Sequence, residues 1–131
     1  MKQVSSMDPT IILLISRDAD IERAASDAAR RTGRTLTVAR TAHEAVKEFT
    51  YGFDRFGIIL VDLDADVHGV TLFNAMGDCH GKAPVVVLTS CEESYMKPLV
   101  LGRGAAACLG KPVTAPQLKR LIEDLCITLS T

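Results

Sequence analysis

The sequence predicts one α/β domain, built on a five-stranded parallel, doubly wound sheet with helices on both faces. Short apolar runs alternate with helical patterns along the 131 residues, which is typical of parallel βαβ units. The runs are continuously apolar, as expected of strands that are buried on both sides. With 47% hydrophobic residues and no Trp, the core must be aliphatic. We expect a disordered leader over residues 1–9 and a single domain over residues 10–129.

The first half of the chain opens with a strand predicted over Ile11 to Ile15, a continuous apolar run. A helix is predicted over Asp20 to Arg31, because this segment is rich in alanine, repeats apolar residues at helical spacing and ends before Gly33. Thr35 to Ala39 is predicted as the second strand. Thr41 to Glu44 has the capping-box pattern that begins a helix.

The second half repeats this alternation. Three further strands are predicted from apolar runs: Gly57 to Asp62, Val85 to Leu88 and Ala105 to Leu109. Helical patterns separate them at Val70 to Met76 and at Glu92 to Leu101. The last helix is predicted to begin at a second capping box, Thr114 to Gln117, in which Pro116 takes an early helical position.

Polar residues stand at the ends of these predicted strands. In an open parallel sheet, working residues gather at the carboxyl ends of the strands, beside the point where the strand order reverses. The residues at these ends are Ser16-Arg17-Asp18, Asp62, Thr89-Ser90 and Lys111. We therefore expect their side chains to converge on one shallow crevice.

Three predicted strands are followed by distinctive residues: Asp62 after the third, Thr89 after the fourth and Lys111-Pro112 after the fifth. This pattern resembles that of the response-regulator receiver domain. This domain is the phosphoacceptor module of two-component signalling. The resemblance covers about residues 10 to 127. It implies a flavodoxin-like (βα)5 fold with the strand order 2-1-3-4-5, in a bacterial, cytoplasmic protein that takes part in a phosphorelay.

The resemblance also implies a role for each site residue. Asp62 would accept a phosphoryl group from a histidine kinase, the Thr89 hydroxyl would bind one phosphoryl oxygen, and Lys111 would neutralise another. The Lys111-Pro112 peptide is a candidate cis bond. Cys108 stands where family members often carry an aromatic side chain, so the usual coupling between that side chain and the threonine cannot operate as such. Tyr95, on the neighbouring predicted helix, is the alternative aromatic partner.

The resemblance fails at the metal site. Receivers hold magnesium with two acids at the end of the first strand, and Ser16 and Arg17 take these two positions here. One carboxylate, that of Asp62, would then face the two cations Arg17 and Lys111, which disfavours a divalent metal. We expect Arg17 either to pair with Asp62 or to turn into solvent, and magnesium binding to be weak or absent.

An improvised metal site is the alternative. Asp64 lies two residues beyond Asp62, and together with Asp18 or Asp20 it would supply carboxylates for weak binding. Asp18 and Asp20 more naturally cap the following helix. The loop after Asp62 also lacks the proline usual in the family, so its geometry departs from the family pattern.

The composition excludes several other functions. A net charge of -1 gives no basis for a nucleic-acid or anionic-membrane surface, and no apolar run reaches the roughly 18 residues of a membrane span. The four cysteines are expected to be free thiols, since none lies in a C-x-x-C pair. Cys79, His80 and Cys91 make a poor zinc set, because two of these ligands are adjacent.

We therefore predict a divergent pseudo-receiver that acts by protein–protein contact and needs no cofactor. It would have no enzymatic activity beyond, at most, its own phosphorylation and dephosphorylation at Asp62. The expected partner is a histidine kinase or an effector domain, and a homodimer is a further option. The alternative is a working phosphoacceptor modified at Asp62. A weaker alternative is a small flavodoxin-like binder of nucleotide or flavin, which the missing Gly-rich loop after the first strand disfavours.

Overall fold

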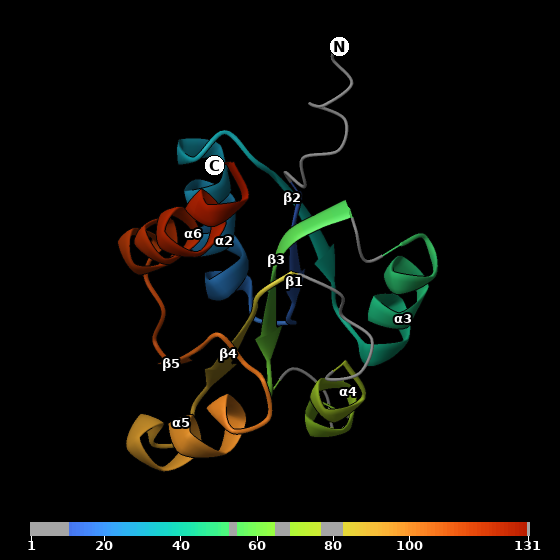
Figure 1. Cartoon of the computed structure of the whole chain (residues 1–131), viewed down its shortest axis with the longest axis vertical. Coiled ribbons are helices and arrows are strands. Elements are labelled where there is room, and N and C mark those ends of the chain that lie inside the picture. The colour runs from blue at the N-terminus through green and yellow to red at the C-terminus, as the bar shows by residue number, and fades with distance from the viewer. Residues whose placement is uncertain (1–10, 53–54, 65–68, 77–82, 131) are drawn as a thin grey trace.

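The computed structural model describes residues 11–52, 55–64, 69–76 and 83–130, and in them strands alternate with helices (Figure 1). The strands are β1 (Ile11–Ile15), β2 (Thr35–Ala39), β3 (Phe56–Asp62), β4 (Val85–Thr89) and β5 (Ala107–Gly110). The helices are α2 (Ala19–Arg31), α3 (Ala42–Thr50), α4 (Gly69–Met76), α5 (Glu93–Leu101) and α6 (Ala115–Ser130). The predicted N-terminal leader lies outside the described residues.

The five strands form one parallel sheet in the order β2-β1-β3-β4-β5, as predicted. β1 pairs with β2 on one side and with β3 on the other, so that Leu14 lies opposite both Val38 and Leu60. The chain therefore reverses its direction across the sheet between β1 and β3. This reversal places the carboxyl ends of β1 and β3 side by side, where α/β sheets carry their sites.

Helices cover both faces of the sheet. Neighbouring residues of a strand point to opposite faces, so Leu14 belongs to the core shared with α2 and α6 while Leu13 belongs to the core shared with α3, α4 and α5. Figure 1 shows α2 and α6 close together on one side of the sheet. Every residue of β3 is buried, which explains its continuous apolar sequence.

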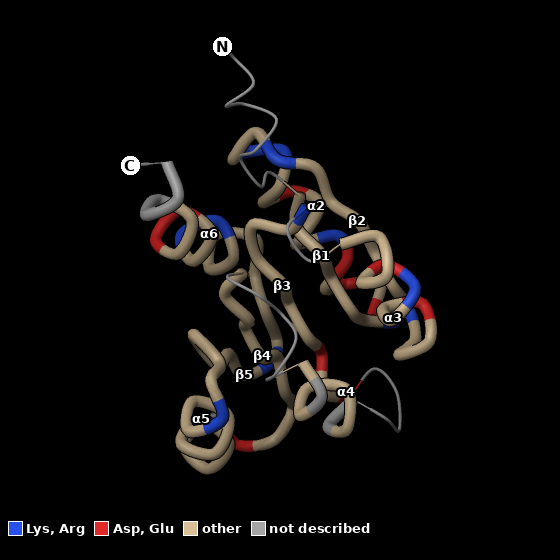
Figure 2. Tube along the Cα trace, turned by 45° about the vertical axis from the view of Figure 1, so that its right-hand side comes forward, with Lys and Arg blue, Asp and Glu red and all other residues tan. Residues whose placement is uncertain are grey.

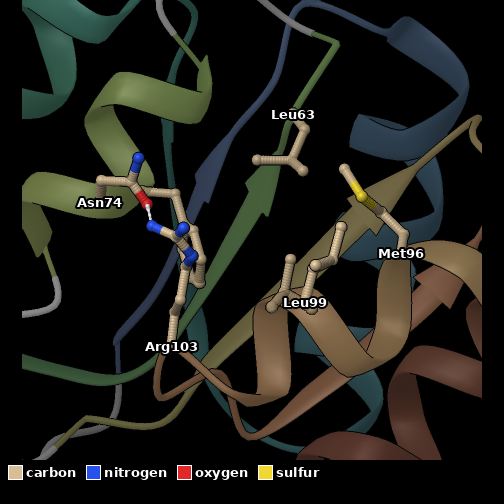
Figure 3. Close-up of a pocket in the computed structure, with 7 residues that line it drawn as sticks. Leu63, Asn74, Met96, Leu99 and Arg103 are labelled. Atoms are coloured by element: carbon tan, nitrogen blue, oxygen red, sulfur yellow. Dashed lines mark hydrogen bonds between the residues drawn. The ribbon is translucent and has the colours of Figure 1, made fainter.

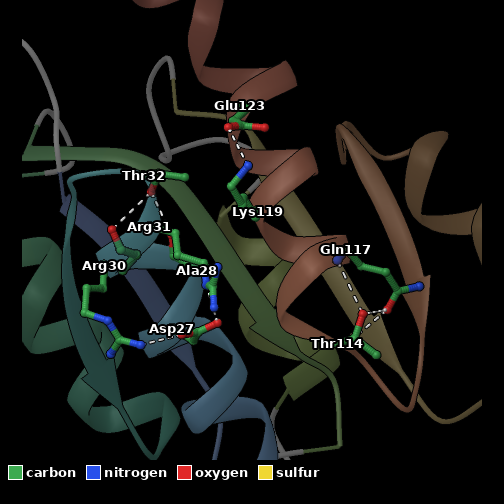
Figure 4. Close-up of polar contacts among 10 residues, drawn as sticks. Asp27, Ala28, Arg30, Arg31, Thr32, Thr114, Gln117, Lys119 and Glu123 are labelled. Atoms are coloured by element: carbon green, nitrogen blue, oxygen red, sulfur yellow. Dashed lines mark hydrogen bonds and ion pairs between the residues drawn. The ribbon is translucent and has the colours of Figure 1, made fainter.

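The predicted capping residues set two of the helix starts. Before α6, the Gln117 N–H donates to Thr114 Oγ1 at 3.3 Å and the Thr114 N–H donates to Gln117 Oε1 at 2.9 Å (Figure 4). This is a complete capping box. Before α3, the Glu44 N–H donates to Thr41 Oγ1 at 3.1 Å, but the Glu44 carboxylate accepts from the Arg40 N–H at 2.8 Å. The second bond of a capping box, which the Thr41 N–H would donate, is therefore donated by the Arg40 N–H instead.

The last strand begins later than predicted. The Ala105 N–H donates to the Val100 carbonyl at 3.0 Å, so Ala105 still closes the C-terminal turn of α5. Gly104 makes this turn with a φ of +100°, a conformation that glycine adopts without strain. β5 consequently starts at Ala107, which lies opposite Val86.

Three cysteines lie in the described residues, Cys91, Cys108 and Cys126, and none of them forms a disulfide there. Cys108 is buried, as predicted for a packed core thiol. Cys79 and His80, which the sequence brings into a poor zinc set, lie outside the described residues. No helix in the described ranges combines the length and apolar character that crossing a bilayer requires.

Candidate functional site

The ends of four neighbouring strands bring the predicted site residues together. Ser16 follows β1, Asp62 ends β3, Thr89 ends β4 and Lys111 follows β5. Because these strands are parallel neighbours, their carboxyl ends lie along one edge of the sheet. Figure 2 shows acidic residues where the end of β3 approaches α4. The expected convergence of side chains is therefore present for Ser16, Asp62 and Lys111.

Asp62 is the buried centre of this group, with only 2% of its surface exposed. Its Oδ1 lies 2.8 Å from Lys111 Nζ and accepts from the Asp64 N–H at 2.9 Å. Its Oδ2 accepts from the Ser16 hydroxyl at 2.8 Å. Both oxygens thus have donors from the protein itself, as a buried carboxylate requires.

Ser16 fixes the loop between β1 and α2 while it binds Asp62. Its Oγ accepts from the Asp18 N–H at 3.0 Å, and its own N–H donates to the Ala39 carbonyl at 3.0 Å. The side chain is buried. Two hydrogen bonds with backbone groups therefore fix the position from which the Ser16 hydroxyl donates to Asp62.

Arg17 turns into solvent, and its expected ion pair with Asp62 does not form. The side chain is exposed, and within the described residues Asp62 is held by Ser16, Asp64 and Lys111. The physical reason is charge and space. The small Ser16 hydroxyl fits beside the buried Asp62 carboxylate, whereas a second buried cation would have to lose its hydration.

Lys111 joins two carboxylates. Its Nζ lies 2.8 Å from Asp62 Oδ1 and 3.1 Å from Asp64 Oδ2, and 18% of its side chain is exposed. Burial alone lowers the pKa of Lys111, but the hydrogen bonds to Asp62 and Asp64 outweigh it and raise the pKa above its ordinary value of 10.5. Lys111 is therefore charged at neutral pH. The Lys111-Pro112 peptide is cis, as predicted.

Asp64 is a second carboxylate at the same edge. Its Oδ2 accepts from the Ser90 N–H at 2.9 Å and lies 3.1 Å from Lys111 Nζ. Partial burial alone raises the pKa of Asp64, but the hydrogen bonds from Ser90 and Lys111 outweigh it, so the pKa lies below its ordinary value of 3.8. Asp64 is therefore ionised at neutral pH and ties the end of β3 to the loop after β4.

Thr89 lies at this edge but faces the following loop. It is fully buried, and its Oγ1 accepts from the Cys91 N–H at 3.0 Å. Its carbonyl accepts from the Lys111 N–H at 2.9 Å. Among the described residues, no hydrogen bond joins the Thr89 hydroxyl to Asp62. Thr89 thus connects β4 to Lys111 through the backbone.

The acids of this edge already have hydrogen-bond or ion-pair partners within the protein. Asp62 Oδ2 is occupied by the Ser16 hydroxyl, and Asp64 Oδ2 is shared by Ser90 and Lys111. Asp18 Oδ1 caps α2 by accepting from the Asp20 and Ile21 N–H groups, as the sequence predicts. Over the described ranges, no group of three or more His, Cys, Asp or Glu side chains is placed to hold a metal.

A small cavity adjoins the site on the side of α4 and α5. It has a volume of about 180 Å³, and Leu63, the residue after Asp62, contributes to its wall together with Phe73 and Met96. At its rim, Arg103 Nη1 donates to Asn74 Oδ1 at 3.1 Å (Figure 3). The cavity is mainly apolar, so it lends no further polar group to Asp62.

One contact in the site was not predicted from the sequence, although Ser90 was expected at this edge. The Ser90 N–H holds Asp64, and the expected role of Asp64 was only that of a weak metal ligand. Because the donor is a backbone N–H, no pattern of side chains in the sequence predicts this bond. The available signal was the position of Ser90 directly after the end of β4, where amide groups face the same edge as Asp62.

Solved structures share this fold, whereas no protein-family model and no curated sequence matches the chain. The receiver domain of the Francisella response regulator 1452 superposes with a TM-score of 0.80 at 20% identity, covering 91% of this chain and 98% of that one. A response-regulator receiver domain protein from Clostridium thermocellum gives 0.78 at 20% identity, covering 92% and 97%. The chain therefore has the receiver-domain fold.

The NtrX protein from Brucella abortus shows the same fold in two settings. Its receiver domain matches with a TM-score of 0.77 at 20% identity, covering 89% of this chain and 98% of that chain. In a structure of longer NtrX, the match has a TM-score of 0.78 at 20% identity and covers 92% of this chain but only 27% of that chain. In NtrX, therefore, this fold is one part of a larger protein.

Proposed function

We propose that this chain is a divergent signalling receiver, which acts by contact with another protein and accepts phosphoryl groups at Asp62 poorly or not at all. The observation that carries the proposal is the 2.8 Å hydrogen bond from the Ser16 hydroxyl to Asp62 Oδ2. The Ser16 hydroxyl lies at a position where receivers carry an acid that binds magnesium.

Phosphoryl transfer to a carboxylate explains why this hydrogen bond matters. The metal ion normally neutralises the charge that develops between the attacking carboxylate and the phosphoryl oxygens. Here a metal on Asp62 Oδ2 would have to share that oxygen with the Ser16 hydroxyl, whose Oγ also accepts from the Asp18 N–H. Arg17, at the next position, adds positive charge and no ligand oxygen. Both features favour weak magnesium binding.

The surface of α5 supports action by contact. Tyr95 and Leu99, four residues apart and therefore on one face of this short helix, are 76% and 55% exposed. Large apolar side chains that share one exposed surface are typical of protein interaction sites. The partner in this proposal is a protein, either a histidine kinase, an effector domain or a second copy of the chain.

The proposal is tested by treating the protein with acetyl phosphate and magnesium and measuring its intact mass. We expect no phosphorylated species under conditions that fully modify an ordinary receiver domain in a parallel reaction, because Asp62 lacks a metal partner. Asp62→Ala, treated in the same way, gives the baseline for modification elsewhere on the chain.

A second function, that of a working phosphoacceptor, is favoured by one observation. Lys111 Nζ lies 2.8 Å from Asp62 Oδ1, at the position from which an ammonium would neutralise a transferred phosphoryl group. A magnesium-dependent gain in mass in the wild-type protein, absent from Asp62→Ala, would establish this second function and overturn the first.

A further inference from the structure

Asp64 carries a carboxylate just beyond the end of β3, at the carboxyl edge of the sheet. Its Oδ2 accepts from the Ser90 N–H at 2.9 Å and lies 3.1 Å from Lys111 Nζ. These two donors come from the loop after β4 and from the end of β5. The carboxylate of one strand end thus holds the two neighbouring strand ends together.

One of the two donors that Asp64 uses, Lys111 Nζ, also serves Asp62. Lys111 Nζ lies between Asp62 Oδ1, at 2.8 Å, and Asp64 Oδ2, so one ammonium is shared by two carboxylates. The Ser90 N–H is already taken by Asp64. A further anion at this edge would face two negative charges and one positive charge, with both donors occupied.

The loop held by Asp64 leads directly into α5. After Ser90, the Cys91 N–H donates to Thr89 Oγ1 at 3.0 Å, and the Tyr95 and Met96 N–H groups both donate to the Glu92 carbonyl at 3.0 Å in the first turn of α5. The bond from Ser90 to Asp64 therefore fixes the start of the segment that presents the exposed apolar side chains of α5.

We infer that Asp64 is an internal oxyanion, whose contacts with the Ser90 N–H and Lys111 Nζ hold the loop between β4 and α5 in place without a phosphoryl group. The inference rests on the proposed function and extends it. Such a domain presents its α5 surface to a partner in the unmodified state. Asp64 is in this account a positioning residue, because it acts on α5 through Ser90 and Lys111.

Amide hydrogen exchange measured by NMR on Asp64→Ala tests the inference. We expect exchange at Ser90 to rise about tenfold, as loss of a charge-assisted hydrogen bond predicts, and exchange at Tyr95 and Met96 to rise with it. Asp64→Asn keeps an acceptor oxygen but removes the charge, so its exchange at Ser90 should lie between that of wild type and that of Asp64→Ala. Asp124→Ala, which removes an exposed acid from α6, should leave all three amides unchanged.

Chemical rescue with sodium formate separates an oxyanion role from an ordinary loop contact. In Asp64→Ala, formate should restore slow exchange at Ser90 in a concentration-dependent way, while sodium chloride at the same ionic strength should not. Unchanged exchange at Ser90 in Asp64→Ala, or faster exchange that formate does not reverse, would overturn the inference. These measurements use neither phosphodonor nor magnesium. They can therefore fail while the proposed function stands, and a phosphorylated wild-type protein would refute the proposed function by a separate readout.

Discussion

Ser16→Asp combined with Arg17→Asp is expected to create a magnesium site beside Asp62. The change replaces the hydroxyl donor that occupies Asp62 Oδ2 and an exposed cation with two carboxylates, which are the ligands that magnesium prefers. We expect magnesium affinity, measured by isothermal titration calorimetry, to rise at least about tenfold, or about 1.4 kcal/mol. That gain is modest against the roughly 4 kcal/mol that one unit charge pair contributes at about 4 Å and an effective dielectric of 20.

A neutral control separates charge from simple loss of the serine contact. Ser16→Asn with Arg17→Gln removes the same hydroxyl and the same cation without adding carboxylates, and it should gain much less affinity. If the double aspartate variant folds normally but binds magnesium no better than wild type, Ser16 and Arg17 do not occupy the metal-binding positions.

Lys111→Met should lower the free energy of unfolding by about 2–3 kcal/mol, measured by urea denaturation. The reason is that Asp62 is only 2% exposed and loses the ammonium 2.8 Å from its Oδ1, while Asp64 loses a second contact. The bonds from Ser16 and the Asp64 N–H remain, which keeps the expected loss below that of a fully unpaired buried charge.

Two controls identify the charge of Asp62 as the cause. Asp62→Asn added to Lys111→Met should recover part of the lost stability, since a neutral amide needs no counter-charge. Lys119→Met removes the exposed pair of Lys119 with Glu123 on α6, 3.0 Å apart (Figure 4), and should change stability by no more than about 0.5 kcal/mol. Equal losses in Lys111→Met and Lys119→Met would contradict this account of the buried pair.

The sequence was sufficient to predict the sheet and the gathering of the site residues. Continuous apolar runs mark strands such as β3, which is buried along its whole length. Once the strands are parallel, the residues that end them must share one edge, so Asp62 and Lys111 meet although they are far apart in the chain. The capping box at Thr114 and Gln117 was equally visible, because both of its bonds use side chains set by sequence spacing.

The sequence was insufficient where a choice depends on the direction of a side chain beyond a strand. Ser16 and Arg17 are adjacent, and regular alternation ends with β1, so the pattern alone did not decide which of them meets Asp62. The structure selects the smaller and neutral one. The bond from the Ser90 N–H to Asp64 was invisible for another reason, since every residue except proline carries this donor.

In the proposed function, protein donors occupy the place of a metal at Asp62. A crystal structure of the wild-type protein, grown at a high magnesium concentration, tests this proposal. The account predicts that Ser16 Oγ and Lys111 Nζ remain within hydrogen-bond distance of the Asp62 carboxylate, with no metal ion bound to that carboxylate. A well-ordered magnesium ion coordinated by Asp62, with Ser16 displaced, would contradict the claim.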